Sequence, residues 1–158
     1  HRVDEQESTD FDKVTARVAA PFALGVGFLG LRTDHQMANL STLARARHLR
    51  CLLIGAEDVV FAAPPEMALS LPPASRVSLF PLAPVQGRSE GLHWPIEGLA
   101  FAPTGPHGTS NRVADGTAEV RLCFDAPGML VILPRAALRP ALAGLRAAPT
   151  WPAPAPAE

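Results

Sequence analysis

Hydrophobic positions follow two different spacings through the first 62 residues. Apolar residues recur at helical spacing over 8–20 and again over 34–48, which predicts two helices. Short, continuous apolar runs over 22–28, 51–54 and 59–62 are typical of buried strands. Because helices alternate with buried strands, we predict a partial α/β N-terminal domain with an incomplete parallel sheet and flanking helices.

The pattern changes past Pro64, where short strands alternate with Gly/Pro turns and no long helix is expected. Strands are predicted over 76–82, 99–102, 117–124 and 129–133, and residues 125–128 are expected to join the last two as a hairpin. From residue 139 on, the Ala/Pro-rich sequence favours an extended, solvated tail. Docking of Trp151 on the domain or on a neighbouring chain is the alternative. We therefore predict a partial α/β domain over 1–72, an all-β sandwich-like domain over 73–138, and an Ala/Pro-rich tail over 139–158.

Local signals refine the two predicted helices. Ser8, Thr9 or Asp10 can cap the first helix. The second helix has an apolar face formed by Met37, Leu40 and Leu43.

Composition excludes several classes of function. The chain has 158 residues and a formal charge of −1, which argues against a basic nucleic-acid binder. Apolar runs stay well short of the roughly 18 residues that span a bilayer. The two cysteines, Cys51 and Cys123, lie far apart in apolar segments and are interpreted as buried thiols in a reducing compartment. We expect a soluble, cytoplasmic protein with neither nucleic acid nor membrane as a partner.

Three glycines spell a G-x-G-x-x-G pattern at Gly25, Gly27 and Gly30, between a predicted strand and a predicted helix. In dinucleotide-binding folds such glycines let a pyrophosphate approach the N-terminus of the helix. Here the first two fall inside the apolar run, and the acidic residue expected about twenty positions further on is missing. A nicotinamide enzyme stays an alternative.

Acidic residues gather near the start of the chain and recur where the second helix begins. Asp4, Glu5, Glu7 and Asp10 lie close together, and Asp34 follows the carboxyl end of the first predicted strand. Ligands bind at that edge of an open α/β sheet, and converging carboxylates need a hard cation such as Mg²⁺ to neutralise them. Acids that stabilise solvated helix N-termini are the alternative.

Polar loops flank an aromatic residue in the predicted β region. Trp94 offers a flat face for an aromatic or cationic ring, while Ser110 and Asn111 offer hydrogen-bonding groups in a turn. A Trp packed in the core beside an ordinary polar turn is the competing interpretation.

Five stretches appear in the order of the motifs D-Q-D-S-T-D-F, G-R-x-D-H, S-L-x-P-L, G-L-x-[WY]-x-L-x-G and S-N, and together they resemble the thiamin pyrophosphokinase family. In this chain they read E-Q-E-S-T-D-F-D-K (5–13), G-L-R-T-D-H-Q-M-A-N-L (30–40), V-S-L-F-P-L (77–82), G-L-H-W-P-I-E-G (91–98) and G-T-S-N (108–111).

The resemblance implies an α/β domain followed by a β-sandwich, and transfer of a pyrophosphoryl group from ATP to thiamin with release of AMP. It implies Mg²⁺ as cofactor and a homodimer in which each site is shared between two chains. The implied residues are Glu7, Asp10 and Asp34 for catalysis, Glu5, Glu7 and Asp34 for the metal, Gln6, Thr9, Arg32 and His35 for the nucleotide, and Trp94, Ser110 and Asn111 for thiamin. The catalytic acids are expected to face one cleft.

The chain departs from the family pattern in two ways. Glu5 and Glu7 stand where the family usually has aspartates, and Mg²⁺ tolerates little distortion of its ligands. Family members also carry earlier D-G-G and G-D-x-D-S motifs, which are absent here, so the chain resembles the C-terminal two thirds of such an enzyme. Its activity by itself is therefore left open, with a non-catalytic thiamin- or nucleotide-binding remnant as the alternative.

Overall fold

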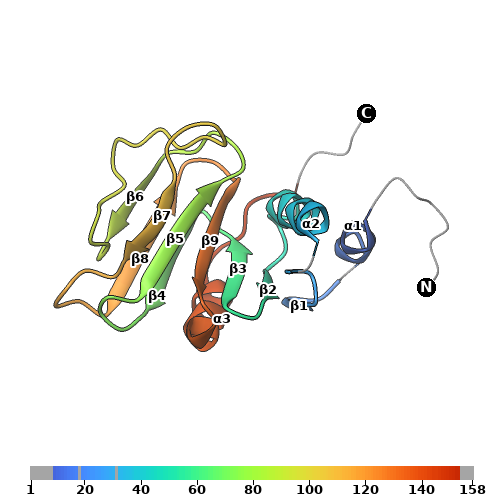
Figure 1. Cartoon of the computed structure of the whole chain (residues 1–158), viewed down its shortest axis with the longest axis horizontal. Helices are drawn as coiled ribbons and strands as arrows, with labels where there is room; N and C mark the ends of the chain where they lie inside the picture. The colour runs from blue at the N-terminus through green and yellow to red at the C-terminus, as the bar shows by residue number, and fades with distance from the viewer. Residues whose placement is uncertain (1–8, 18, 31, 154–158) are drawn as a thin grey trace.

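The computed structural model describes residues 9–17, 19–30 and 32–153 (Figure 1). In chain order the elements are α1 (Asp10–Thr15), β1 (Ala23–Val26), α2 (Thr33–Arg45), β2 (Cys51–Ile54), β3 (Asp58–Ala62), β4 (Glu66–Ser70), β5 (Arg76–Pro81), β6 (Gly87–Glu90), β7 (Gly108–Arg112), β8 (Glu119–Phe124), β9 (Met129–Pro134), a 3₁₀ turn η1 (Arg135–Ala137) and α3 (Leu138–Ala147).

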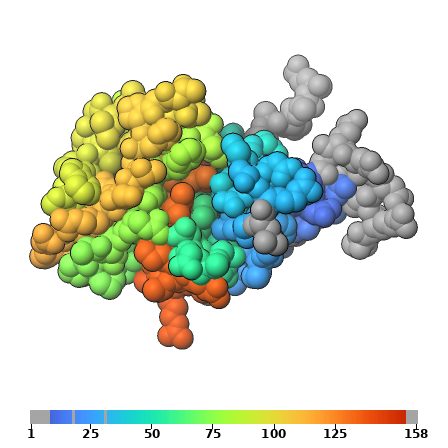
Figure 2. Space-filling model, viewed as in Figure 1, coloured from blue at the N-terminus to red at the C-terminus, as the bar shows by residue number. Residues whose placement is uncertain are grey.

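The strands form two sheets. The larger, six-stranded sheet has the order β1-β2-β3-β9-β5-β7, and the smaller has the order β4-β8-β6. Among the strands that the structure describes, β1 and β2 are the one parallel pair, and the other paired neighbours are antiparallel. The space-filling view places the helix-rich N-terminal part and the strands β6–β8 at opposite ends of the molecule (Figure 2). The fold is therefore a mixed-sheet structure with a few helices.

One hydrophobic core lies between the two sheets and α3. Phe61 and Val131 reach it from the larger sheet, Leu69 and Leu122 from the smaller sheet, and Leu145 from α3. The opposite face of the larger sheet is covered by α1 and α2, where Phe11 and Leu43 pack against buried strand residues in a second cluster. Burial on both faces explains why β2 and β3 read as continuous apolar runs.

Several predicted elements are confirmed, with shifted ends. Both helices form, but α1 covers only Asp10–Thr15 of the range predicted from 8 to 20. Met37 is 67% exposed, so the apolar face predicted for α2 is buried at Leu43 but open at Met37. Strand β2 has the predicted bounds, and β3, β5, β8 and β9 lie within a residue or two of theirs.

The predictions for the β region contain two errors. The range 99–102 is not a strand, because Phe101 makes only an isolated bridge to Val85. Residues 125–128 do not close a hairpin, because β8 and β9 belong to different sheets. Three strands were also missed: β4, β6 and β7. The chain changes sheets where the sequence suggested that it turned back on itself.

Over residues 139–153 the prediction of an extended, solvated tail is wrong, and the alternative of a docked Trp151 is confirmed. Residues 138–147 form α3, in which Pro140 stands in the first turn, where its missing N–H costs no helical hydrogen bond. Beyond it, the indole Nε1 of Trp151 donates a hydrogen bond to the Ala63 carbonyl at 2.8 Å, and the ring packs against the core. Arg50 donates to the carbonyls of Leu145 and Ala148, which ties the end of α3 to the start of β2.

The division at residue 72 stays a prediction, although β3 from one side of it pairs with β9 from the other. Cys51 is buried as predicted, and burial raises its pKa to about 11, whereas Cys123 is only partly buried. Within the described part of the chain, no helix is long and apolar enough to cross a membrane.

Candidate functional site

A short loop after β1 leads directly into α2, at the carboxyl end of the parallel strand pair. Gly27 and Gly30 adopt positive φ angles of 84° and 104° there, which glycine permits at no steric cost. The backbone N–H of Gly30 donates to Oε1 of Gln36 at 3.0 Å, and Nδ2 of Asn39 donates to the Phe28 carbonyl at 2.8 Å. Side chains of α2 therefore hold this loop in place.

Gly25, the first glycine of the G-x-G-x-x-G pattern, has a packing role within β1. A Cβ at this position would clash with Leu53 Cδ2 and would lie 3.0 Å from the Phe28 ring. The close approach of strand and loop thus accounts for this glycine without a dinucleotide.

An exposed ion pair marks the start of α2. Arg32 stands at the N-cap position and donates to both carboxylate oxygens of Asp34, at 3.2 and 2.7 Å. The hydrogen bond from Arg32 is the main reason that the pKa of Asp34 falls to about 2. A carboxylate with so low a pKa is a weak proton acceptor and stays ionised at neutral pH, as a ligand for a cation must be. His35, beside it, is also exposed.

The N-terminus of α1 is capped by Thr9, one of the three capping residues that the sequence offered. The Asp12 N–H donates to Oγ1 of Thr9 at 3.2 Å, and Oδ2 of Asp12 accepts from the Thr9 N–H at 3.0 Å and its hydroxyl at 2.7 Å. This reciprocal arrangement is a capping box. The hydroxyl proton of Thr9 is thus already directed at Asp12 rather than at solvent.

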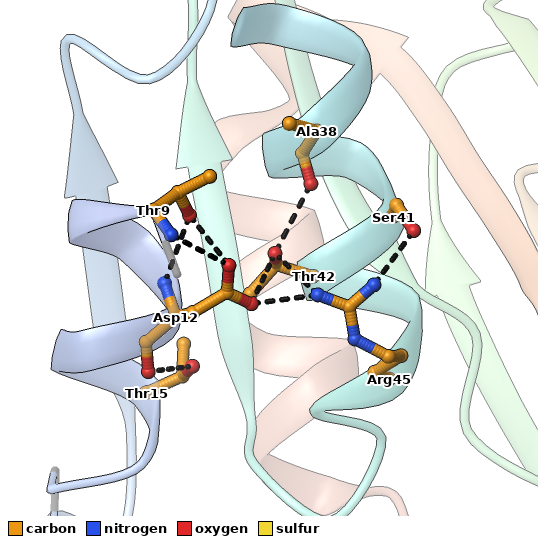
Figure 3. A network of polar contacts seen from close by, with 7 residues as sticks. All are labelled: Thr9, Asp12, Thr15, Ala38, Ser41, Thr42 and Arg45. Carbon is orange, nitrogen blue, oxygen red and sulfur yellow. Dashed lines mark hydrogen bonds and ion pairs between the residues drawn. The ribbon is translucent and has the colours of Figure 1, made fainter. Parts of the chain in front are cut away.

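The second carboxylate oxygen of Asp12 reaches across to α2 (Figure 3). Oδ1 accepts from the Thr42 hydroxyl at 2.6 Å and from Nη2 of Arg45 at 2.6 Å. Burial alone would raise the pKa of Asp12, but hydrogen bonds from Thr42, Thr9 and Arg45 outweigh it and lower the pKa to about 2. One ionised carboxylate therefore joins the cap of α1 to the C-terminal half of α2.

Most of the predicted metal site lies outside the residues that the structure describes. Glu5, Gln6 and Glu7 lie outside the described residues, so the shared cleft for the catalytic acids stays a prediction. Asp10 is exposed on α1, and Asp34 is exposed on α2. Over residues 9–17, 19–30 and 32–153, no three His, Cys, Asp or Glu side chains come close enough to hold a metal ion.

The residues predicted to bind thiamin are brought together by strand β7 and by the loop that links β6 to β7. Asn111, on β7, is only 5% exposed and clamps the backbone of Trp94. Its Nδ2 donates to the Trp94 carbonyl at 2.7 Å, and its Oδ1 accepts from the Trp94 N–H at 3.2 Å. Ser110 is exposed at a φ of 60°, with its N–H donating to Oγ of Ser78 at 3.0 Å. A positive φ is uncommon for a residue with a side chain, and strain of this kind clusters at functional sites.

The indole of Trp94 lies on the surface, not in the core, because 55% of the residue is exposed. The His93 ring meets it edge-on at a centroid distance of 4.5 Å. The Arg112 guanidinium carbon lies 6.0 Å from the indole centroid, at the outer limit of a cation–π contact. The alternative of a core Trp is therefore wrong, while the assignment to thiamin stays a prediction.

Solved structures identify the architecture. Thiamin pyrophosphokinase from Bacillus subtilis matches 82% of this chain with a TM-score of 0.67 and 18% identity. A thiamin pyrophosphokinase family protein from Enterococcus faecalis matches 84% with a TM-score of 0.64 and 19% identity. The enzyme from Candida albicans matches 70% with a TM-score of 0.62 and 16% identity. The fold is that of the thiamin pyrophosphokinases.

The similarity to these solved structures is one of fold, at 16–19% sequence identity, and it covers part of each relative. No family model matches the sequence, and no curated protein matches it either. The chain spans 64% of the B. subtilis protein, 66% of the E. faecalis protein and 43% of the C. albicans protein. The family suspected from the sequence motifs is thus supported at the level of the fold.

Sequence reasoning missed one residue of the candidate site. Asp12 is the most highly connected carboxylate near the N-terminus, yet it lies outside the acidic positions that the motifs single out. The T-x-x-D spacing from Thr9 to Asp12 is a capping-box signal and could have revealed half of its role. The other half, the bonds to α2, depends on tertiary packing that a local pattern does not encode.

Proposed function

We propose that the chain belongs to a thiamin pyrophosphokinase-like transferase that moves a pyrophosphoryl group from ATP to thiamin. The hydroxyethyl oxygen of thiamin would form a bond to the β-phosphorus of ATP. The bond from that phosphorus to the α,β-bridging oxygen would break, AMP would leave with that oxygen, and the hydroxyl proton would pass to a base. Thiamin diphosphate and AMP would be the products.

The observation that carries this proposal is the clamped, exposed Trp94 on a thiamin pyrophosphokinase fold. Asn111 fixes the Trp94 backbone from both its N–H and its carbonyl, and Pro95 restrains that backbone further. A fixed, open indole is a suitable platform for the thiazolium ring of thiamin, which carries a positive charge. Ser110 lies next to Asn111 in sequence and would meet the polar edge of the ring.

The phosphate side of the site would use the α/β part of the chain. Glu5, Glu7 and Asp34 would hold Mg²⁺, whose charge neutralises phosphate oxygens and whose preferred ligands are carboxylates. The ionised state of Asp34 fits that role. Arg32 would leave Asp34 and turn to the phosphates, with Gln6, Thr9 and His35 completing the nucleotide contacts and Asp10 serving catalysis. This arrangement relies on positioning and charge, as phosphoryl-type transfer generally does.

We further propose a homodimer whose sites are each completed by the β region of the partner chain, as the resemblance implies. Cytoplasmic thiamin and ATP would be the substrates. The free cysteines are in keeping with a reducing compartment.

A second candidate is a thiamin- or nucleotide-binding module without transferase activity. The observation that favours it is the clamped Trp94, which would suffice to bind a thiamin ring without a phosphate site.

Product analysis separates the two candidates. The chain is incubated with Mg-ATP and thiamin, and AMP and thiamin diphosphate are quantified by chromatography. The proposal predicts equal amounts of both products, and their loss in Asp34→Asn. Binding of thiamin without product supports the module instead, and absence of both product and binding contradicts both candidates.

A further inference from the structure

Asp12 bonds to two helices at once. Its carboxylate accepts four hydrogen bonds, two from Thr9 at the cap of α1 and two from Thr42 and Arg45 on α2 (Figure 3). Its side chain is 23% exposed, against 62% for Arg45. A partly buried, charge-assisted network of this kind is stronger than a surface ion pair.

A neutral side chain cannot replace this carboxylate. Each oxygen receives two donors, and an Asn at position 12 would offer one oxygen and one NH₂ group. The NH₂ group would face donors either at the Thr9 cap or at Arg45, so one connection would be lost. If the NH₂ group points toward α2, the amide oxygen still accepts from Thr9 and the cap is preserved. The Thr42 hydroxyl can then rotate to accept a hydrogen bond from the NH₂ group, while Arg45 moves into solvent.

The two helices that Asp12 joins carry residues from both sides of the proposed phosphate site. Thr9 and Asp10 stand at the start of α1, and Asp34 stands in the first turn of α2. The helices run side by side in the same direction (Figure 3). An apolar contact between the Phe11 and Phe28 rings, at a centroid distance of 4.6 Å, also ties α1 to the loop that precedes α2. A rotation of α1 about that contact would move Thr9 and Asp10 relative to Asp34.

We propose that Asp12 is a positioning residue for Mg-ATP, which it never touches: it sets the start of α1 against α2. This inference rests on the proposed function. It also assigns a purpose to Thr42 and Arg45, which fix the carboxylate from the α2 side.

The test measures affinities rather than turnover. Calorimetry gives the Kd values of Mg-ATP and of thiamin for the 158-residue chain and for three variants. Asp12→Asn removes the charge. The double variant Thr42→Val/Arg45→Met breaks the tie from α2 and leaves the Thr9 cap intact. Asp58→Asn is the matched control, because it removes a comparable ion pair, to Arg76, from a different part of the sheet.

We expect Asp12→Asn and Thr42→Val/Arg45→Met each to raise the Kd of Mg-ATP by about tenfold, the lower end of the losses seen when groups that orient metal ligands are changed. The Kd of thiamin should stay within about twofold of the parent value, since RT ln 2 is only about 0.4 kcal/mol. Combining all three substitutions should add little to either variant, because both interrupt the same connection. Asp58→Asn should bind both ligands as the parent does.

The outcomes distinguish this inference from the function on which it rests. A parent chain that does not bind Mg-ATP refutes the proposed function, and the role of Asp12 with it. A parent that binds Mg-ATP while the double variant binds equally well refutes the positioning role alone. If Asp12→Asn fails to fold, the double variant decides, since Arg45 is exposed and Val closely matches the shape of Thr. Equal losses of thiamin and Mg-ATP affinity in that variant also overturn the inference, because they indicate general unfolding.

Discussion

Replacing Trp151 with Ala should destabilise the protein far more than the same replacement at Trp94. Trp151 follows α3, where its indole donates a hydrogen bond to Ala63 and packs against the main core. Trp94 makes its hydrogen bonds to Asn111 through the backbone, which the substitution leaves in place. The two positions therefore compare loss of a docked indole with loss of an exposed one.

The magnitudes follow from burial. A fully buried Trp costs about 3–5 kcal/mol when truncated to Ala, so the partly buried Trp151 should cost about 2–3 kcal/mol, of which the hydrogen bond supplies about 1 kcal/mol. The ring of Trp94 loses only its contacts with His93 and Arg112, worth about 0.5–1 kcal/mol at an exposed site. Trp151→Phe keeps most of the apolar contact and should cost about 1 kcal/mol.

Urea denaturation followed by far-UV circular dichroism measures these differences in unfolding free energy as shifts of the midpoint urea concentration. Thermal unfolding gives a second measure: for a chain of this size each kcal/mol lowers Tm by about 2–4 °C, so Trp151→Ala should melt about 4–12 °C below the parent. A loss under about 0.5 kcal/mol, the scatter of ordinary surface changes, would show that the segment after α3 is not docked. A larger loss for Trp94→Ala than for Trp151→Ala would refute the assignment of Trp94 to the surface.

Two further predictions follow from other contacts, and a third follows from the proposed dimer. The pKa of Asp12 is about 2 in the fold against an ordinary 3.8, so its contribution to stability, about 2 kcal/mol, is complete above pH 4 and is lost as the pH falls towards 2. Acid titration of the unfolding free energy should show that loss in the parent but not in Asp12→Asn; identical curves would contradict it. Arg50→Met removes both hydrogen bonds to the end of α3 and should lower the unfolding free energy by about 2 kcal/mol. An unchanged midpoint of urea denaturation would show that these bonds contribute little. Light scattering should give twice the 16.7 kDa chain mass, and a monomer at high concentration would exclude the dimer.

The part of the fold that local pattern could predict is the part buried on both faces. Residues 51–54 and 59–62 are apolar throughout because they lie between the main core and the helices, so their runs mark them as strands. Gly108–Arg112 carries polar side chains and is a strand only because β5 pairs with it. No local signal encodes that partner. The helix α3 was missed because the Ala/Pro-rich composition from residue 139 was taken to favour an extended chain, although the first turn of a helix tolerates Pro140.

Local pattern likewise predicted some features of the candidate site and missed others. Local pattern predicted Asp34 at the start of a helix after a strand, and the resemblance to the family grouped Trp94 with Asn111. The sequence did not indicate that Arg32 pairs with Asp34 or that Asp12 reaches Arg45. Those contacts arise from side-chain geometry and from the packing of α1 on α2.

Calorimetric titration of the 158-residue chain with thiamin tests the central claim most directly, because it needs neither turnover nor the metal. The account predicts saturable binding of one thiamin per chain by the parent. It predicts that Trp94→Ala keeps its fold but binds thiamin more weakly by about 0.5–2 kcal/mol, which is about 2- to 30-fold in Kd. Absence of thiamin binding by the folded parent, or equal binding by parent and Trp94→Ala, would contradict it.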